Sequence, residues 1–189
     1  MEQDFTKIKV YPGKKKVRYE NPTNLKFIGR GYTGAVFKLS NTKCVKIYVE
    51  QKKAKDEAKA LRTGQDSPIM PKLYDVGSNY IVMEYIRGPS LSSYLKKTKE
   101  LPNHLSKQIL FCLKELDRLG FPRTNVHVRH FIIANDNKLK VIDHANVYKE
   151  LSKKPTYLLR GLRKLGLLND FMEYVKKADP KTYNDWVSY

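Results

Sequence analysis

Glycines spaced for phosphate binding are the first chemically informative feature of the sequence. Residues 29–36 read GRGYTGAV, which matches the pattern G-x-G-x-x-G-x-V. The same spacing occurs in dinucleotide-binding folds, where the glycines open a helix, but here the alternation AVFKL follows and predicts a strand. Glycines at a hairpin turn let backbone amides lie close over phosphate groups. We therefore interpret Gly29, Gly31 and Gly34 as a phosphate-binding turn, with an ordinary glycine-rich turn as the alternative.

A lysine and a glutamate follow that could act with this turn. Lys46 lies in the apolar strand sequence CVKIY, one strand after the glycines. Ala54, Glu57, Ala58 and Leu61 have the spacing i, i+3, i+4, i+7, so they share one face of a helix whose other residues are rich in lysine. A glutamate on that inward face needs a cation, because an unpaired buried charge is costly. We predict an ion pair between Lys46 and Glu57; the alternative for Lys46 is a solvent-facing position.

The elements that position these residues can be read from hydrophobic periodicity. Between Leu25 and Tyr48 the alternation of apolar and polar residues predicts three antiparallel strands. The period becomes helical over residues 50–61, and prolines and a glycine then interrupt it. Two short strands are expected at 72–76 and 80–83. The sequence YIRGP at residues 85–89 resembles a linker, and we place a lobe boundary there.

The second half of the chain is predicted to be mostly helical. Residues 90–97 form a short helix, and a longer buried helix follows, with apolar side chains at i, i+4, i+7, i+8 and i+11: Leu105, Ile109, Cys112, Leu113 and Leu116. Gly120 and Pro122 should end that helix. The polar turn Asn-Asp-Asn joins a hairpin over 131–134 and 139–142, and residues 158–175 are helical again. The expected architecture is α+β, with a basic N-terminal segment (1–20), an antiparallel β N-lobe with one helix (21–84) and a reduced helical C-lobe with an embedded β-hairpin (85–189).

Composition limits the class of protein. With 41% hydrophobic and 30% charged residues the chain can build a core. Its two cysteines, Cys44 and Cys112, lie in apolar stretches without metal-type spacing, so we expect reduced, buried thiols as in the cytoplasm. The first residues do not resemble a signal peptide, and no apolar run is long enough for a membrane span. A soluble cytoplasmic protein is expected.

The net charge of +18 is the unusual bulk property. It favours anionic partners, such as an acidic protein or nucleic acid, although a solvated basic surface would give the same composition. The densest cluster is formed by Lys14, Lys15, Lys16 and Arg18. No zinc-finger spacing, aromatic RNA-recognition pattern or GXXG clamp accompanies it.

Taken together, residues 24–147 resemble the protein-kinase-like superfamily, and in particular the small serine/threonine kinases of bacteria. The resemblance rests on the glycine turn, on the lysine–glutamate pair and on VMEYIRGPSL at residues 82–91, which is similar to the family's hinge. It implies a minimal two-lobed kinase-like fold that binds ATP. It further implies that Lys46 acts on the phosphates, that Val36 lies against the nucleotide, and that backbone groups of Glu84 and Ile86 bind the adenine.

The catalytic end departs from the family pattern. Asp143, in VIDHA, occupies the place of the aspartate of D-F-G, with His-Ala instead of Phe-Gly. In the register that preserves the predicted hairpin, His130 replaces the metal-binding asparagine and Asn125 replaces the catalytic aspartate. Arg123-Thr124 then replace His-Arg, and His127 falls where a phosphate-contacting lysine often lies. Lipopolysaccharide-core kinases are similar in having a histidine at the metal position, which implies that His130 and Asp143 bind Mg²⁺ or Mn²⁺.

Two main functions compete at this point, with a third behind them. The first is a phosphotransferase that moves the γ-phosphate of ATP to a hydroxyl-bearing acceptor, with a protein expected as that acceptor. The second is an ATP-binding pseudokinase that acts as a regulatory or scaffold module, because the amide of Asn125 cannot accept a proton. The third is a basic nucleic-acid-binding module.

Overall fold

The computed structural model describes residues 4–122, 124–149, 151 and 154–187. They divide into two compact units. The first consists of the described residues up to Ile86 together with Asp143–Asn146, and the second of Arg87–Ile142 together with the described residues from Val147 onward. None of the helices in these ranges combines the length and the hydropathy needed to cross a lipid bilayer.

A five-stranded antiparallel sheet forms the frame of the first unit. Its strands are β3 (Lys26–Arg30), β4 (Gly34–Lys38), β5 (Lys43–Tyr48), β6 (Leu73–Val76) and β7 (Tyr80–Glu84), in the order β3-β4-β5-β7-β6. The three consecutive strands and the two short later strands predicted from alternation are therefore confirmed. Val36 of β4 pairs with Gly29 of β3 on one side and with Lys46 of β5 on the other. Lys46 therefore lies on the strand next to β4, which begins at the end of the glycine turn.

One face of this sheet is packed against a small N-terminal hairpin. The hairpin consists of β1 (Lys9–Tyr11) and β2 (Arg18–Glu20), preceded by the short 3-10 helix η1 (Phe5–Lys7). Ile8 and Val17 from this region are buried in one core cluster with residues of the sheet. The sheet residues of that cluster alternate along the strands, as expected for one face: Ala35, Phe37, Val45, Ile47 and Val82.

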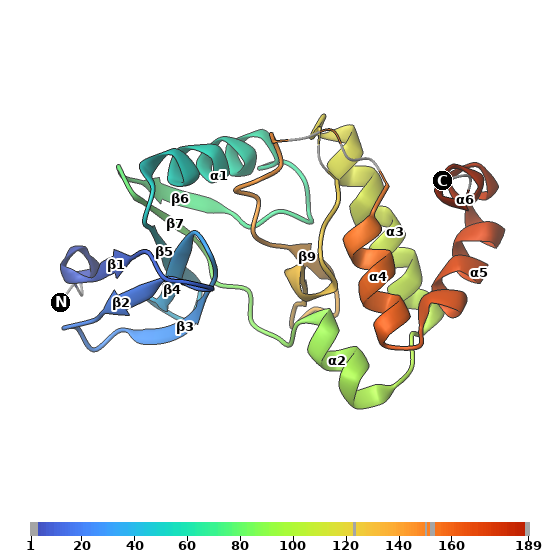
Figure 1. Ribbon diagram of the computed structural model, residues 1–189, viewed down its shortest axis with the longest axis horizontal. Helices are drawn as coiled ribbons and strands as arrows, with labels where there is room; N and C mark the ends of the chain where they lie inside the picture. Colours follow the sequence, from blue (N-terminus) through green and yellow to red (C-terminus); the bar gives the residue numbers. More distant parts are fainter. Residues whose placement is uncertain (1–3, 123, 150, 152–153, 188–189) are drawn as a thin grey trace. The chain divides into compact units, whose positions relative to one another are not determined.

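The opposite face of the sheet carries Lys46 and lies against α1 (Gln51–Thr63), which Figure 1 shows along β6 and β7. The buried residues of α1 include Ala54, Glu57, Ala58 and Leu61, the stripe predicted from their spacing. The helix ends at Gly64, whose backbone amide caps the last carbonyls. Glu57 is therefore held on the inward face of a helix by its apolar neighbours.

The second unit begins with helices and an embedded hairpin. Helix α2 (Leu91–Thr98) starts at Ser90, whose hydroxyl accepts from a backbone amide of the first turn, and α3 (Asn103–Arg118) follows. The hairpin pairs β8 (Phe131–Ile133) with β9 (Leu139–Val141), as predicted. Helix α3 ends just before Gly120, which has a φ of 74° and provides the left-handed residue that closes the helix.

The C-terminal region contains three helices, so the helical character predicted for residues 158–175 is confirmed, with one interruption. They are α4 (Thr156–Lys164), α5 (Leu168–Ala178) and α6 (Pro180–Val187), with α5 packed between α4 and α6 (Figure 1). The break occurs because Gly166 adopts a φ of 76° and the amide of Leu167 bonds back to Leu162 O at 3.0 Å. The α+β class, with the antiparallel sheet first and the helices after it, is confirmed.

Candidate functional site

Glu57 is the centre of a buried polar network in the first unit. Its side chain is 1% exposed, and both carboxylate oxygens accept hydrogen bonds. Oε2 accepts from Lys46 Nζ and from Tyr48 Oη, each at 2.7 Å, and Oε1 accepts from the backbone amide of His144 at 3.1 Å. The predicted ion pair between Lys46 and Glu57 is present. Three donors on one buried carboxylate fix the position of α1 relative to β5 and to the segment 143–146.

Lys46 is shared between two carboxylates. Its Nζ lies 2.7 Å from Glu57 Oε2 and 3.0 Å from Asp143 Oδ1, while its side chain is 9% exposed. Burial by itself lowers the pKa of the ammonium group, but attraction by Asp143 and Glu57 outweighs burial, so the pKa of Lys46 is raised. The lysine is therefore a permanent, positioned cation at neutral pH.

Asp143 is the more accessible partner of this lysine. Its side chain is 38% exposed, in contrast to Glu57, and its backbone has a φ of 68°. A non-glycine residue in this left-handed region is uncommon and often marks a functional position. In the same segment, Asn146 Oδ1 accepts from Lys53 Nζ of α1 at 3.0 Å. The segment 143–146 is thus bonded to α1 and to β5, and it exposes the carboxylate of Asp143 to solvent.

The glycine turn is a hairpin between β3 and β4, as predicted. Gly31 N donates to Gly34 O at 3.0 Å and closes the turn. The three glycines differ in what surrounds them. A Cβ at Gly34 would collide with the carbonyl oxygen of Ile47 in β5, whereas a Cβ at Gly29 or Gly31 would have no atom within 4 Å. Gly34 is therefore needed for packing, and Gly29 and Gly31 leave an open strip of backbone that a ligand could approach.

The segment that resembles a kinase hinge, residues 82–91, begins at the end of the first unit. Glu84 is the last residue of β7, and its amide donates to Lys72 O at 2.8 Å. Tyr85 N donates to Thr42 O at 2.8 Å, and Ile86 is the last residue before the unit boundary. The predicted adenine contacts of Glu84 and Ile86 stay predictions; within the first unit the Glu84 amide donates to Lys72 O, and the Glu84 carbonyl accepts from Cys44 Sγ at 3.7 Å.

In the second unit Asn125 has a structural partner. Its Oδ1 accepts from the backbone amide of Tyr157 at 2.7 Å, in the first turn of α4. This contact satisfies one of the amide groups that the start of a helix leaves without an intrahelical partner. The predicted catalytic position is therefore also a helix cap from a residue 32 positions away in the sequence. Arg123, which was placed in the same motif, lies outside the described residues.

Two histidines lie beside that cap. The ring of His127 is parallel to the ring of Tyr157, with centroids 4.4 Å apart, and it meets His130 edge to face at 5.2 Å. Both histidines are partly exposed. His130 O accepts from Ile142 N at 2.9 Å, next to the end of β9. His130 belongs to the second unit and Asp143 to the first, so their joint metal binding stays a prediction; no group of three or more His, Cys, Asp or Glu side chains suited to a metal occurs in the described part of the chain.

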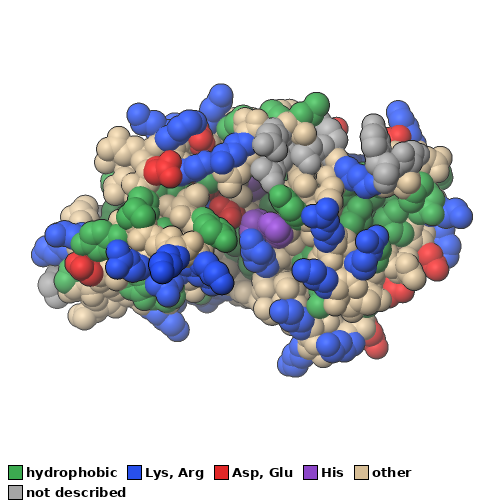
Figure 2. Space-filling view, in the orientation of Figure 1, with side chains coloured by type: hydrophobic (Ala, Val, Ile, Leu, Met, Phe, Trp, Pro, Cys, Tyr) green, Lys and Arg blue, Asp and Glu red, His purple; other side chains and the backbone are tan. Residues whose placement is uncertain are grey.

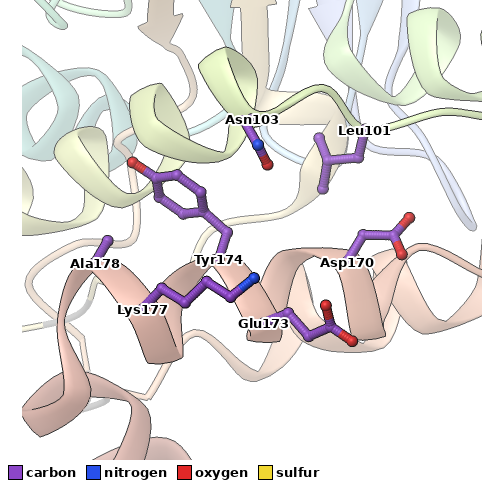
Figure 3. Close-up of a pocket in the computed structure, with 7 residues that line it drawn as sticks. All are labelled: Leu101, Asn103, Asp170, Glu173, Tyr174, Lys177 and Ala178. Carbon is purple, nitrogen blue, oxygen red and sulfur yellow. The ribbon is translucent and has the colours of Figure 1, made fainter.

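A separate depression lies between α5 and the segment that leads into α3. Its volume is about 570 Å³, and Figure 3 shows Tyr174 and Lys177 on α5 facing the side of Leu101 and Asn103. The other lining residues also belong to α5: Asp170, Glu173 and Ala178. None of the residues predicted from sequence to bind ATP or metal lines it. The depression mixes acidic, basic and apolar side chains, and it contains no convergent set of groups for phosphate chemistry.

Sequence reasoning missed two groups of the Glu57 network. Tyr48 lies two residues after Lys46 in β5, and residues i and i+2 of a strand share a face, so the alternation contained this signal. The backbone amide of His144 comes from 87 positions further along the chain, and no local pattern points to it. Tyr157, which stacks on His127 and donates to Asn125, was also not predicted.

Comparison with known proteins gives one distant relationship. A protein of Bacillus subtilis named "Putative serine/threonine-protein kinase YrzF" is 26% identical to this chain over 158 residues, which cover 73% of the chain and 74% of that relative. No protein-family model matches the chain. At the coarse level, a kinase-like relationship is supported.

Proposed function

We propose that this chain is an ATP-dependent phosphotransferase, a minimal atypical serine/threonine kinase that moves the γ-phosphate to a hydroxyl group. The observation that carries the proposal is the chain of contacts Glu57–Lys46–Asp143 beside an open glycine turn. A lysine held between a buried and an accessible carboxylate can bind phosphate oxygens without moving, because Glu57 already fixes it. Such preorganised charge is the main contribution that a protein makes to phosphoryl transfer.

We expect this site to bind an ATP molecule and its metal ion. The strip at Gly29 and Gly31, where an added Cβ would meet nothing within 4 Å, leaves backbone room for phosphates. Asp143 is the carboxylate that would hold Mg²⁺ or Mn²⁺, with His130 as the second ligand expected from sequence. The bound ion would neutralise negative charge on the phosphates. Lys46 would bind phosphate oxygens, and Glu57 would keep the lysine in place.

The transfer itself requires a proton acceptor. The acceptor hydroxyl oxygen forms a bond to the γ-phosphorus while the bond to the β,γ-bridging oxygen breaks; ADP leaves, and the hydroxyl proton must be taken up. Asn125 cannot take it, since an amide is not basic at neutral pH. His127, in the same segment, can. Loss of an aspartate base costs about 10²–10⁴-fold in rate, so slow transfer is expected.

A pseudokinase is the second candidate, and one observation favours it. Asn125 caps α4, which is a structural reason for an asparagine at the position of the catalytic base. Incubation with γ-labelled ATP and Mg²⁺ or Mn²⁺, followed by detection of labelled protein and of released phosphate, separates the two functions. Asn125→Asp should accelerate transfer by about tenfold or more, equivalent to about 1.4 kcal/mol of barrier. Nucleotide binding with no transfer by either protein would favour the pseudokinase.

A further inference from the structure

Half of the net charge of the chain lies in 45 consecutive residues near its N-terminus. The segment from Asp4 to Tyr48 carries eleven lysines and arginines and two acids, so its net charge is +9 out of +18. Apart from Lys46, which is buried, these basic residues are exposed or partly exposed. Figure 2 shows Lys and Arg side chains over the strands of the first unit, and others over the rest of this face. The phosphotransferase proposal uses only Lys46 from this set.

The densest part of this surface is the lysine turn, residues 12–16 (Pro-Gly-Lys-Lys-Lys), between β1 and β2. All five residues are exposed. The turn is nevertheless a defined structure. A Cβ at Gly13 would collide with the carbonyl oxygen of Lys16, and the Nε of Arg18 donates back to Pro12 O at 3.4 Å. The lysines are thus presented on a hairpin that packs against the sheet.

The lysine turn has no counter-charge of its own. No acidic side chain forms an ion pair with Lys14, Lys15 or Lys16 in the part of the chain that the structure describes. Three adjacent ammonium groups repel one another, and a defined turn limits how far they can separate. A bound polyanion would remove this repulsion and would release its own counterions.

An exposed aromatic ring lies close to the lysine turn. Val17 N, at the end of the turn, donates to Gly31 O at 2.9 Å, and the next residue, Tyr32, is 78% exposed. The backbone hydrogen bond therefore places the ring and the three lysines on neighbouring segments. Arg30 strengthens the connection, because its Nη1 donates to Val17 O at 3.1 Å. An aromatic face beside a row of cations is the combination that stacks a base and contacts adjacent phosphates.

We propose that the lysine turn and Tyr32 form a binding surface for single-stranded nucleic acid. An acidic peptide would use the lysines and leave the ring without a role. An anionic membrane would be met by several apolar side chains beside the lysines, whereas the turn itself offers Pro12 and Gly13. A single strand uses both features, since its phosphates and its unpaired bases are accessible together. This proposal does not depend on the phosphotransferase activity.

The test is fluorescence anisotropy with labelled oligonucleotides of about 12 nucleotides, within the usual range of single-strand sites. Replacing Lys14, Lys15 and Lys16 together by serine should weaken binding by about tenfold or more at ~0.1 M salt and reduce the salt slope by about 2, as expected for three lost contacts to a single strand. The matched control replaces the three exposed lysines at the end of α2, Lys96, Lys97 and Lys99, by serine. It removes the same charge from the second unit and should change affinity by about twofold or less, since these lysines touch no phosphate in the proposed complex.

The aromatic ring has its own test. Tyr32→Ala should weaken binding by about fivefold or more without changing the salt slope, and Tyr32→Phe should retain affinity, because stacking requires the ring and not the hydroxyl. The proposal is overturned if the control triple variant loses as much affinity as the turn variant, or if Tyr32→Ala binds normally. It is also overturned if a duplex of equal length, a polyglutamate peptide or phosphatidylserine vesicles bind as tightly as the single strand. Circular dichroism of each variant shows whether the variant is folded. The salt dependence of the wild-type affinity measures the number of phosphate contacts without any substitution.

Discussion

Removing the cation from the Glu57 network should destabilise the first unit strongly, and removing the carboxylate as well should restore part of the loss. In Lys46→Met, Glu57 keeps only two neutral donors, Tyr48 Oη and His144 N, while its side chain is 1% exposed. Breaking a buried ion pair by deleting one partner costs about 3–5 kcal/mol, mainly because the remaining charge stays buried. Asp143 adds little to this cost, since its side chain is 38% exposed and can be hydrated.

The double variant Lys46→Met/Glu57→Gln is the informative one. The glutamine has the shape of the glutamate and its carbonyl oxygen can still accept a hydrogen bond, but the buried charge is gone. We expect it to be more stable than Lys46→Met by about 1–3 kcal/mol, the usual cost of a buried polar group that lacks its partner. Lys43→Met, on an exposed residue of the same strand, is the control and should cost less than about 1 kcal/mol.

Guanidinium unfolding followed by far-UV circular dichroism gives the free energies, and hydrogen exchange of peptides from β5 and α1 shows where the loss occurs. A difference of 1.4 kcal/mol corresponds to about tenfold in the local exchange rate when opening is in equilibrium. The reasoning is refuted if the two substitutions are additive, so that the double variant is less stable than Lys46→Met. It is also refuted if Lys46→Met and the control Lys43→Met cost the same.

Three further outcomes follow from the described contacts. Gly34→Ala should destabilise the fold by about 1–3 kcal/mol because its Cβ collides with the backbone of β5, whereas Gly31→Ala should leave stability unchanged and weaken nucleotide binding, as measured by calorimetry. Asp179→Ala should cost about 1 kcal/mol at pH 7, since the carboxylate caps α6. Hydrogen bonds from Lys114 of α3 and from Thr182 in the first turn of α6 lower the pKa of Asp179. The contribution of Asp179 is therefore complete above about pH 4 and declines on further acidification, so the difference in melting temperature between wild type and variant should be smaller at pH 2 than at pH 7. Burial raises the pKa of Cys44 and of Cys112 to about 12, so neither thiol should react with a disulfide reagent at pH 8 until the protein is unfolded, and fast labelling of the native protein would contradict this.

Local sequence patterns were sufficient for the order and type of the main elements. Alternation identified β3 to β7, a 3.6-residue period identified α1 and α3, and Gly120 marked the end of α3. The Lys46–Glu57 pair was predictable for the same reason. A strand and the helix that follows it are close in sequence, and their two periods determine which side chains face each other. Both cysteines are free and buried, as their apolar surroundings indicated.

The remaining features depend on contacts between distant parts of the chain. The strands β1 and β2 are three residues each and rich in charge, and they are stabilised by packing Ile8 and Val17 against the sheet, which no local propensity reveals. The cap that Asn125 provides for α4 joins residues 32 positions apart, and the amide of His144 reaches Glu57 across 87 positions. The sequence by itself determined which residues could form a phosphate site, because residue type and spacing are local properties. Only the tertiary structure decided that Glu57 has three donors and that Asn125 caps a helix, because a buried polar group takes its partners from whichever backbone the fold brings to it.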